Sequence, residues 1–599
     1  MDGQMFESNE ERTFQYQDSL PPLPVPNLCQ SITKYLDSVK PFLTHEELQT
    51  TTQIAKRFLS GQGAELHAKL HSWAKDKRNW LEEWWLNSAY LDNREPTMLN
   101  VNFAGAAPYL EHYWEPKEGT QVERPTSFIS LSNLRQQLAV HKSGAAPFDM
   151  DQFRMLYCTC RIPGETRDSI VNYFQTEEEG PCPSHLIVQC RGRVFVFNTL
   201  VNEQILTPPE IFRQLTFIRE LCGKEPEGPG VSALTSEART KWAKAREYLI
   251  SLDPTNVTVL ELIQNSLFVL SLDDTSPNVS PEDYSEICAA SLTGNPTVRW
   301  GDKSYNCLSF ANGTFGSNCD HSPYDAMVMV SLCYYIDLQV KSIEGKWQGS
   351  KAIRDIPLPE ELIFVVDEKI LEDIEQAKQQ YQKQVCRRLV LLSSTRHAAI
   401  PQHNLPNTPH VFITSRLDYG NFLLVSLPNS LLRKLQIIQN SAACVLSCTR
   451  LRGPITPTLA RLHWLPIHQR IEFKIFHHEL MTEAQVGKGF DRHLLGLLQI
   501  AKEEGLPVPE LYTDIGFTRS GGGGNFVLST SLVGYTTVLG AVVPMVRNGY
   551  GFFYRIRDDR IVVACSAWKS SPETNAEELY KAVSLSFQEM VQMVSKSQL

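Results

Sequence analysis

Short apolar runs alternate with longer amphipathic stretches through residues 100–380, and this alternation limits the fold more than any other feature of the chain. Residues 186–190 and 194–197 have the length and apolar content of strands, whereas residues 238–252 have the pattern of a helix. Strands that alternate with helices are typical of α/β proteins. We therefore predict an α/β fold, and 599 residues are enough for two or more domains.

The N-terminal part carries a strong helix signal. Thr44 and Glu47 have the spacing of a capping box, which predicts the start of a helix. A long helical stretch is expected to follow, with Trp73, Trp80 and Trp84 on one buried face.

The C-terminal part predicts a hairpin and a helix. Residues 551–556 and 561–567 read as two strands around a charged turn. Asn575, with Glu578 at capping-box spacing, begins a run of apolar residues with a helical period.

Composition excludes several classes of protein. No apolar run approaches 18 residues, so a membrane-spanning helix is not expected. The first 17 residues are acidic, which is unlike a secretory signal or a mitochondrial presequence. Fourteen cysteines without regular spacing are typical of a reduced compartment. The closest pair, Cys158 and Cys160, is expected to be structural, and we expect neither a metal nor a cofactor.

Residues 385–486 differ from the rest of the chain in charge. They carry 11 Lys and Arg against 4 Asp and Glu, or +7, whereas the whole chain has a net charge of −10 and the remainder therefore −17. The same segment holds 7 of the 15 histidines. Such a break indicates a segment of different origin or role.

A histidine loop is the first candidate for chemistry. His321 follows a turn at Asn312 and Gly313 and precedes an apolar run, residues 326–332, which predicts a loop between two buried elements. An imidazole in such a loop can act as a general base near pH 7. Asp325 lies four residues on, a spacing that lets two side chains share a helical face. A purely structural role for the pair is the alternative that the pattern leaves open.

Two further groups could contact a substrate. Ser529 and Ser531 fall on one face of a predicted strand after the glycines at 521–524, and two hydroxyls in one cleft can donate to a carboxylate or an oxyanion. Arg492 opens an apolar helical run, and a guanidinium can bind a carboxylate through two bonds. A flexible surface loop and a surface ion pair are the alternatives.

These residues occur within a pattern similar to one known family. Residues 20–32 resemble the N-terminal signature of the carnitine/choline acyltransferases, residues 320–325 their catalytic histidine site, and residues 529–531 their hydroxyl motif. Residues 296–302 and 560–568 also look like family sequence. The similarity is greatest to the peroxisomal, medium-chain members, and it covers residues 20–384 and 487–599.

The resemblance implies a fold and a reaction. The fold is two similar α/β domains, each a mixed sheet with flanking helices, that meet at a tunnel. His321, beside Asp325, would take a proton from the carnitine hydroxyl or the CoA thiol in a direct, reversible transfer. Ser531 would stabilise the oxyanion. Ser529 and Arg492 would hold the carnitine carboxylate, and Gly540 would leave a deep acyl pocket.

The substrates implied are acyl-CoA and L-carnitine, in fatty-acid metabolism and in the export of shortened acyl chains from peroxisomes. Five parts of the chain are expected: a tail (1–19), an arm with helices that packs on the second domain (20–86), a first domain with the catalytic histidine (87–384), a foreign segment (385–486) and the rest of the second domain (487–599).

The foreign segment departs from the family. The family's lysine-rich CoA-binding segment and its Tyr/Thr-containing carnitine-binding segment are missing there. Residues 385–486 instead resemble a part of a retrotransposon reverse transcriptase that lacks the paired aspartates of a polymerase site. Three hypotheses follow. The chain is a medium-chain acyltransferase, a catalytically inactive chimera that binds CoA and carnitine weakly, or, through its positive segment, a nucleic-acid binder. Nucleic acid is the partner least expected.

The last three residues, Ser597, Gln598 and Leu599, are similar to a peroxisomal targeting tripeptide, with Gln where a basic residue is preferred. We expect a monomer that the peroxisomal import receptor recognises and that is otherwise cytoplasmic.

Overall fold

The computed structural model describes residues 11–106, 117–123, 138–143, 145–280, 283–344, 346–397, 429–446, 467–522, 526–532, 539–556 and 560–596. The chain divides into two compact units. The sheet unit contains Met1–Pro21, Glu83–His397 and Asn525–Ala582. The helical unit contains Pro22–Glu82, Ala398–Gly524 and Val583–Leu599.

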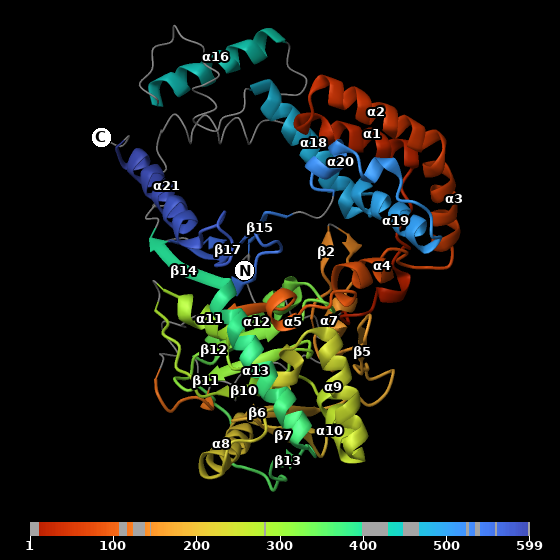
Figure 1. Cartoon of the computed structure of the whole chain (residues 1–599). Coiled ribbons are helices and arrows are strands. Elements are labelled where there is room, and N and C mark those ends of the chain that lie inside the picture. The colour runs from red at the N-terminus through yellow and green to blue at the C-terminus, as the bar shows by residue number, and fades with distance from the viewer. Residues whose placement is uncertain are drawn as a thin grey trace. The chain divides into compact units, whose positions relative to one another are not determined.

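An eight-stranded mixed sheet forms the centre of the sheet unit (Figure 1). Three neighbouring strands, β6, β10 and β11, run parallel, and the other pairings are antiparallel. In sheet order the strands are β13 (Glu360–Leu362), β7 (Arg193–Asn198), β6 (His185–Cys190), β10 (Val269–Asp273), β11 (Asn306–Phe310), β12 (Phe315–Cys319), β1 (Phe103–Ala106) and β16 (Leu539–Ala541). The strands predicted at 186–190 and 194–197 are confirmed.

Helices cover both faces of this sheet, because alternate strand residues are apolar on both sides. Leu186 and Val188 pack in one core with α8 (Pro208–Lys224) and α12 (Ala326–Ser342). Ile187 packs in a second core with helices on the other face, α9 (Arg239–Leu252), α10 (Pro254–Asn265) and α13 (Glu368–Arg388). The helix predicted at 238–252 and the mixed α/β class are therefore confirmed.

A four-stranded sheet lies in the same unit, in the order β14 (Leu389–His397), β18 (Arg560–Trp568), β17 (Tyr550–Ile556) and β15 (Leu528–Leu532). One buried cluster joins the two sheets: Ala104 of β1 and Ala541 of β16 pack with Val562 and Ala564 of β18. The predicted hairpin is confirmed by the antiparallel pairing of β17 and β18, although its turn lies outside the described residues.

The C-terminal helix begins as its sequence predicts. Asn575 Oδ1 accepts bonds from the backbone N–H groups of Glu577 and Glu578 at 3.0 and 3.2 Å, and α21 spans Ala576–Lys596.

The long stretch predicted after Thr44 is helical, but the prediction that its tryptophans share one helical face is wrong. Its capping box with Glu47 is present, but the chain forms α2 (His45–Ser60), α3 (Gln62–Ala74) and a short α4 (Glu82–Leu86). Gly61, at φ −123° and ψ −116°, leaves helical geometry and ends α2. Trp73 is the next-to-last residue of α3 whereas Trp80 lies before α4 begins, so the tryptophans do not share one helical face, although Trp80 and Trp84 are buried as expected.

In the helical unit, segments far apart in the sequence lie side by side (Figure 1). Helices α1 (Leu28–Val39), α2 and α3 pack with α19 (Phe490–Glu503) and α20 (Ile515–Arg519). Buried polar bonds connect them: Thr51 donates to Asp514 Oδ2 at 2.6 Å, and Ser31 Oγ lies 2.8 Å from His493 Nδ1. The compact units cross the expected domain boundaries because β16 joins the large sheet, whereas the packing of residues 490–519 on the N-terminal helices is a contact that the arm at 20–86 is expected to make.

Residues 385–486 are described in three parts. Strand β14 pairs with β18 along its whole length, so regular sheet pairing continues past the expected boundary at Val385. Helices α16 (Asn429–Leu446) and α18 (Ile467–Gln485) belong to the helical unit. Among the described residues, no helix combines the length and the apolar character that crossing a membrane requires.

Candidate active site

His321 lies in the loop that connects β12 to α12. Gly313, at φ +74°, makes the tight turn from β11 into β12, a conformation that favours glycine. All five residues of β12 are buried, and α12 begins at Ala326 with Asp325 as its N-cap residue. The predicted loop between two buried elements is therefore confirmed.

The imidazole of His321 has a defined orientation. Its Nδ1 lies 3.2 Å from the backbone carbonyl of Tyr324, and the ring packs against Tyr90 and Phe103, with centroid distances of 5.5 and 5.1 Å. A hydrogen bond to the carbonyl requires the proton on Nδ1, which leaves the lone pair on Nε2. The side chain is 29% exposed. The loop thus presents a nitrogen that can accept a proton from a bound molecule.

Asp325 does not share a helical face with His321, which corrects the expectation from their spacing. The i, i+4 relation requires both residues to be helical, but the helix begins only after Asp325. The distance from His321 Nδ1 to Asp325 Oδ1 is 3.8 Å, too long for a hydrogen bond, and the Asp325 side chain is 69% exposed. Its role beside His321 remains a prediction.

Tyr90 and Phe103 are contacts that the sequence reasoning missed. Both are more than 200 residues from His321 in the chain, and neither carries a local signal of its own. Burial raises the pKa of Tyr90 to about 12, so its hydroxyl is neutral at physiological pH. The pair shapes the walls around the imidazole without adding charge.

The two serines lie on β15, as their alternation predicts. This strand runs parallel to β17, with Ser529 opposite Gly551 and Ser531 opposite Phe553. Ser529 is half-buried and Ser531 is exposed, and their side chains share one face of the strand.

Gly540 lies in β16, paired with Gly105 of β1, and Phe553 is close to it. A Cβ atom at Gly540 would lie 2.8 Å from Phe553 Cδ1, so any side chain there must displace that ring.

The sheet unit thus holds His321, Ser529, Ser531 and Gly540, whereas Arg492 belongs to the helical unit. Arg492 is exposed in the first turn of α19, and its Nη1 donates to the Ala484 carbonyl at a long 3.4 Å. Most of its donors therefore face solvent. Within the described ranges, no group of three or more His, Cys, Asp or Glu side chains is arranged to hold a metal ion.

His493, the residue after Arg492, should make the stability of the helical unit depend on pH. His493 is fully buried, with Nε2 3.0 Å from His67 Nδ1 and Nδ1 2.8 Å from Ser31 Oγ. Burial, followed by the charges of His67 and His71, lowers the pKa of His493 to about 3, against about 6.5 in an unfolded chain. A lowered pKa means that the unfolded chain binds the proton first. The stabilisation is therefore complete above pH 6.5 and is lost between pH 6.5 and 3, at up to about 1.4 kcal/mol per pH unit.

We expect hydrogen exchange in α19 and α3 to accelerate as the pH falls below 6.5, after correction for the intrinsic exchange rate. The variant His493→Gln should flatten this dependence, whereas His45→Gln, at an exposed position of the same unit, should leave it unchanged. Equal pH profiles in the parent and His493→Gln would contradict the prediction.

Comparison with known proteins matches the chain to one family. The model of the choline/carnitine O-acyltransferase family matches residues 23–395 and 476–584. The unmatched residues between these two ranges, 396–475, lie inside the segment predicted to be foreign. The family model therefore matches the first and last residues of that segment, 385–395 and 476–486. The origin of that segment remains a prediction.

Several curated proteins are similar over their whole length. A human protein named peroxisomal carnitine O-octanoyltransferase is 54% identical over 100% of both chains, and its bovine counterpart is 55% identical over 99% of both. A rat carnitine O-acetyltransferase is 28% identical over 94% of this chain and 91% of its own.

Proposed function

This chain belongs to the choline/carnitine O-acyltransferase family, and from that membership we propose that it transfers medium-chain acyl groups reversibly between coenzyme A and L-carnitine. One structural observation carries the proposal: a partly exposed histidine whose Nδ1 faces a backbone carbonyl and whose Nε2 is left to accept a proton. The full-length similarity to octanoyltransferases gives no support to the inactive chimera.

The mechanism follows from these groups. His321 Nε2 takes the proton of the carnitine hydroxyl, and the oxygen attacks the thioester carbonyl of acyl-CoA. Ser531 donates a hydrogen bond to the oxyanion of the tetrahedral intermediate. The intermediate collapses with cleavage of the C–S bond, and the thiolate takes the proton back from the imidazolium. The reverse reaction uses the same groups. We assign Asp325 to the catalytic site as the carboxylate beside His321.

An acyl-chain series tests the function. We expect the purified chain to transfer octanoyl groups from CoA to carnitine faster than acetyl groups. Gly540→Met should reduce octanoyl transfer at least tenfold and acetyl transfer far less, because a side chain at Gly540 meets Phe553 and fills the space that we assign to the acyl chain. A parent chain without octanoyl transfer would refute the proposed function.

We predict that Arg492 determines carnitine affinity. A guanidinium that binds a carboxylate contributes about 1.5–3 kcal/mol, or roughly 10- to 100-fold in affinity. Arg492→Ala should therefore raise the carnitine KM by about that factor and leave the KM for octanoyl-CoA within about twofold. Arg519→Ala, at another partly exposed arginine of the helical unit, is the matched control. Equal carnitine KM values in the two variants would count against the assignment.

We further propose that the chain functions in the peroxisome, where the names of its relatives place them. Ser597, Gln598 and Leu599 lie outside the described residues and would be read by the import receptor. A fluorescent reporter that carries the last twelve or so residues should colocalise with a peroxisomal marker, and removal of the final leucine should abolish this. A reporter that stays wholly cytosolic would show that these residues do not direct import.

A further inference from the structure

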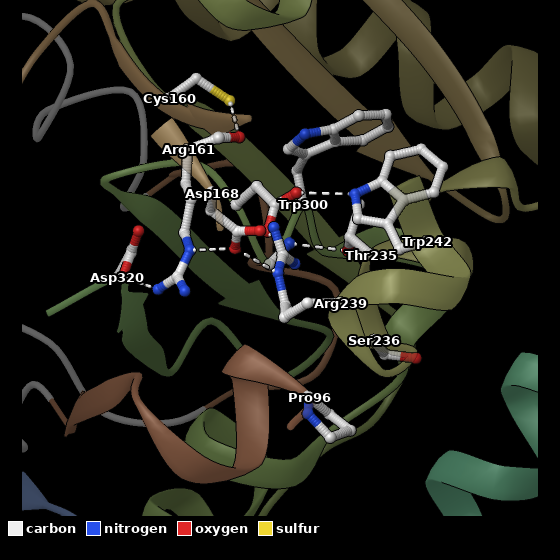
Figure 2. A network of polar contacts seen from close by, with 12 residues as sticks. Pro96, Cys160, Arg161, Asp168, Thr235, Ser236, Arg239, Trp242, Trp300 and Asp320 are labelled. Carbon is white, nitrogen blue, oxygen red and sulfur yellow. Dashed lines mark hydrogen bonds and ion pairs between the residues drawn. The ribbon is translucent and has the colours of Figure 1, made fainter. Parts of the chain in front are cut away.

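A network of buried charged side chains, which includes Arg161 and Asp320, contacts the residues on either side of His321; Figure 2 shows this network. The two neighbours of the histidine turn inward: Asp320 and Ser322 are 1% and 7% exposed. Asp320 Oδ1 accepts bonds from the backbone N–H and the hydroxyl of Ser322, at 2.9 and 2.7 Å. The backbone on both sides of His321 is therefore fixed from the interior.

Arg161, in β4 (Thr159–Ile162), contacts this loop with one arm of its guanidinium. Its Nη1 donates to Ser322 Oγ at 2.7 Å and lies 3.9 Å from Asp320 Oδ1. Its other arm, Nη2, donates to the carbonyl of Tyr90 at 2.8 Å. Because the Tyr90 ring packs on the imidazole, one buried arginine contacts the loop that carries His321 and the residue that covers it.

A second layer fixes Arg161 itself. Asp168 Oδ2 accepts from Arg161 Nε and from Arg239 Nε, both at 2.6 Å, so it lies between the two arginines, as Figure 2 shows. Arg239 Nη1 donates to Asp302 Oδ1 at 2.6 Å, and Trp242 Nε1 donates to the other oxygen at 2.7 Å. Burial would raise the pKa of Asp168, but Arg239 and Arg161 hold it below its usual range, so this carboxylate stays ionised.

A contribution to the stability of the fold does not by itself explain why these charges are buried together. Burial of ions costs several kcal/mol each, and apolar replacements of buried ion pairs are often neutral or stabilising. The planar guanidinium does, however, hold its three donors in fixed directions toward three separate acceptors, whereas the three donors of a lysine rotate about one nitrogen.

We propose that Arg161 is a positioning residue for acyl transfer, a role that rests on the function proposed above. It fixes Ser322 and Tyr90, and through them the place and rotation of the His321 imidazole. A displacement of about 1 Å at a reacting group can cost on the order of 100-fold in rate, so the anchor is expected to affect kcat more than substrate binding.

The test compares two buried arginines. Arg161→Lys keeps the charge and removes the fork. Arg299→Lys makes the same change at another fully buried arginine, which bonds to Asn295 and Ala290 carbonyls and to Asp273 and makes no contact recorded with residues 320–324. Both variants are measured for melting temperature, for kcat and KM in octanoyl transfer, and for the rate at which diethyl pyrocarbonate modifies His321, followed by peptide mass spectrometry.

We expect Arg161→Lys to lower kcat by about 10- to 100-fold, to leave both KM values within about twofold, and to change the modification rate of His321 at least threefold. Arg299→Lys should keep kcat and the modification rate within about twofold, even at a similar loss of melting temperature. Ser322→Ala, which removes the acceptor of Nη1 and the hydroxyl bond to Asp320 Oδ1, should lower kcat about three- to tenfold.

Equal kcat losses in Arg161→Lys and Arg299→Lys, or a kcat loss without a change in His321 modification, would overturn the proposal. If Arg161→Lys fails to fold, Ser322→Ala decides: unchanged kcat and unchanged His321 modification would also overturn it. A parent chain without turnover refutes the proposed function instead, and the modification rates then still test the positioning of His321.

Discussion

Replacement of His321 by alanine is expected to lower kcat for octanoyl transfer by about 10²- to 10⁴-fold, the contribution typical of a general base. Without Nε2, the proton of the carnitine hydroxyl has no acceptor at the attacking oxygen. Because the side chain is partly exposed, its removal should leave no closed cavity and only a small change in stability. The KM values for both substrates should change little, because the lost contact acts in the transition state.

The measurement is steady-state kinetics in both directions, since one base serves the forward and the reverse transfer. His185→Asn is a control in the same unit: His185 is buried, and its Nε2 lies 2.7 Å from the Leu262 carbonyl, away from the loop. The control should keep kcat within about threefold. If His321→Ala stays within tenfold of the parent, another group is the base.

Where a signal is local, the sequence predicted the structure well. The capping box at Thr44, the strands β6 and β7, and the hairpin of β17 and β18 each depend on neighbouring residues, and all are present. The His321 loop belongs to this class, because the buried runs on both sides of it are contiguous in sequence.

Where a helix boundary decided the outcome, the sequence misled. The spacing of His321 and Asp325 suggested a shared helical face, but Asp325 lies outside the helix, at the N-cap position and without a side-chain capping bond. Helix α3 likewise ends at Ala74, before Trp80, so the helix that the tryptophan spacing suggested does not reach from Trp73 to Trp84. In both cases the spacing matched a helical period, but the residues did not lie in one helix.

The contacts around the base could not be read from one sequence. Arg161, Asp168, Arg239 and Asp302 are charged residues of kinds that usually lie at the surface. The pairing of β4 with β5 (Ser169–Asn172) and the packing of α9 in the core bring them together beside residues 320–322. Single charges in a sequence do not show which partners neutralise them, so the positioning network is visible only in three dimensions.

The compact units cross the expected domain boundaries because strands that are distant in sequence pair in one sheet. The strand signals at 551–556 and 561–567 predict a hairpin but not which sheet it joins, and no strand was predicted at 539–541. Leu539–Ala541 pairs with Phe103–Ala106, more than 400 residues earlier, and thereby extends the large sheet. The tunnel between two domains that the family resemblance implies stays a prediction.

Replacement of Ser531 by alanine is the second large effect that we predict, a fall in kcat of about 10²- to 10³-fold, equivalent to about 2.7–4 kcal/mol of oxyanion stabilisation. Ser531 is exposed on β15, so loss of its hydroxyl removes no buried bond and should shift stability by less than about 0.5 kcal/mol. Thr530→Val is the matched control, because the adjacent exposed hydroxyl points to the opposite face of the strand, and it should keep kcat within about threefold. Ser529→Ala should instead raise the carnitine KM, because this hydroxyl is assigned to the carboxylate. A Ser531→Ala enzyme with near-parent kcat, or a Thr530→Val enzyme equally impaired, would show that β15 does not present Ser531 to the reacting carbonyl.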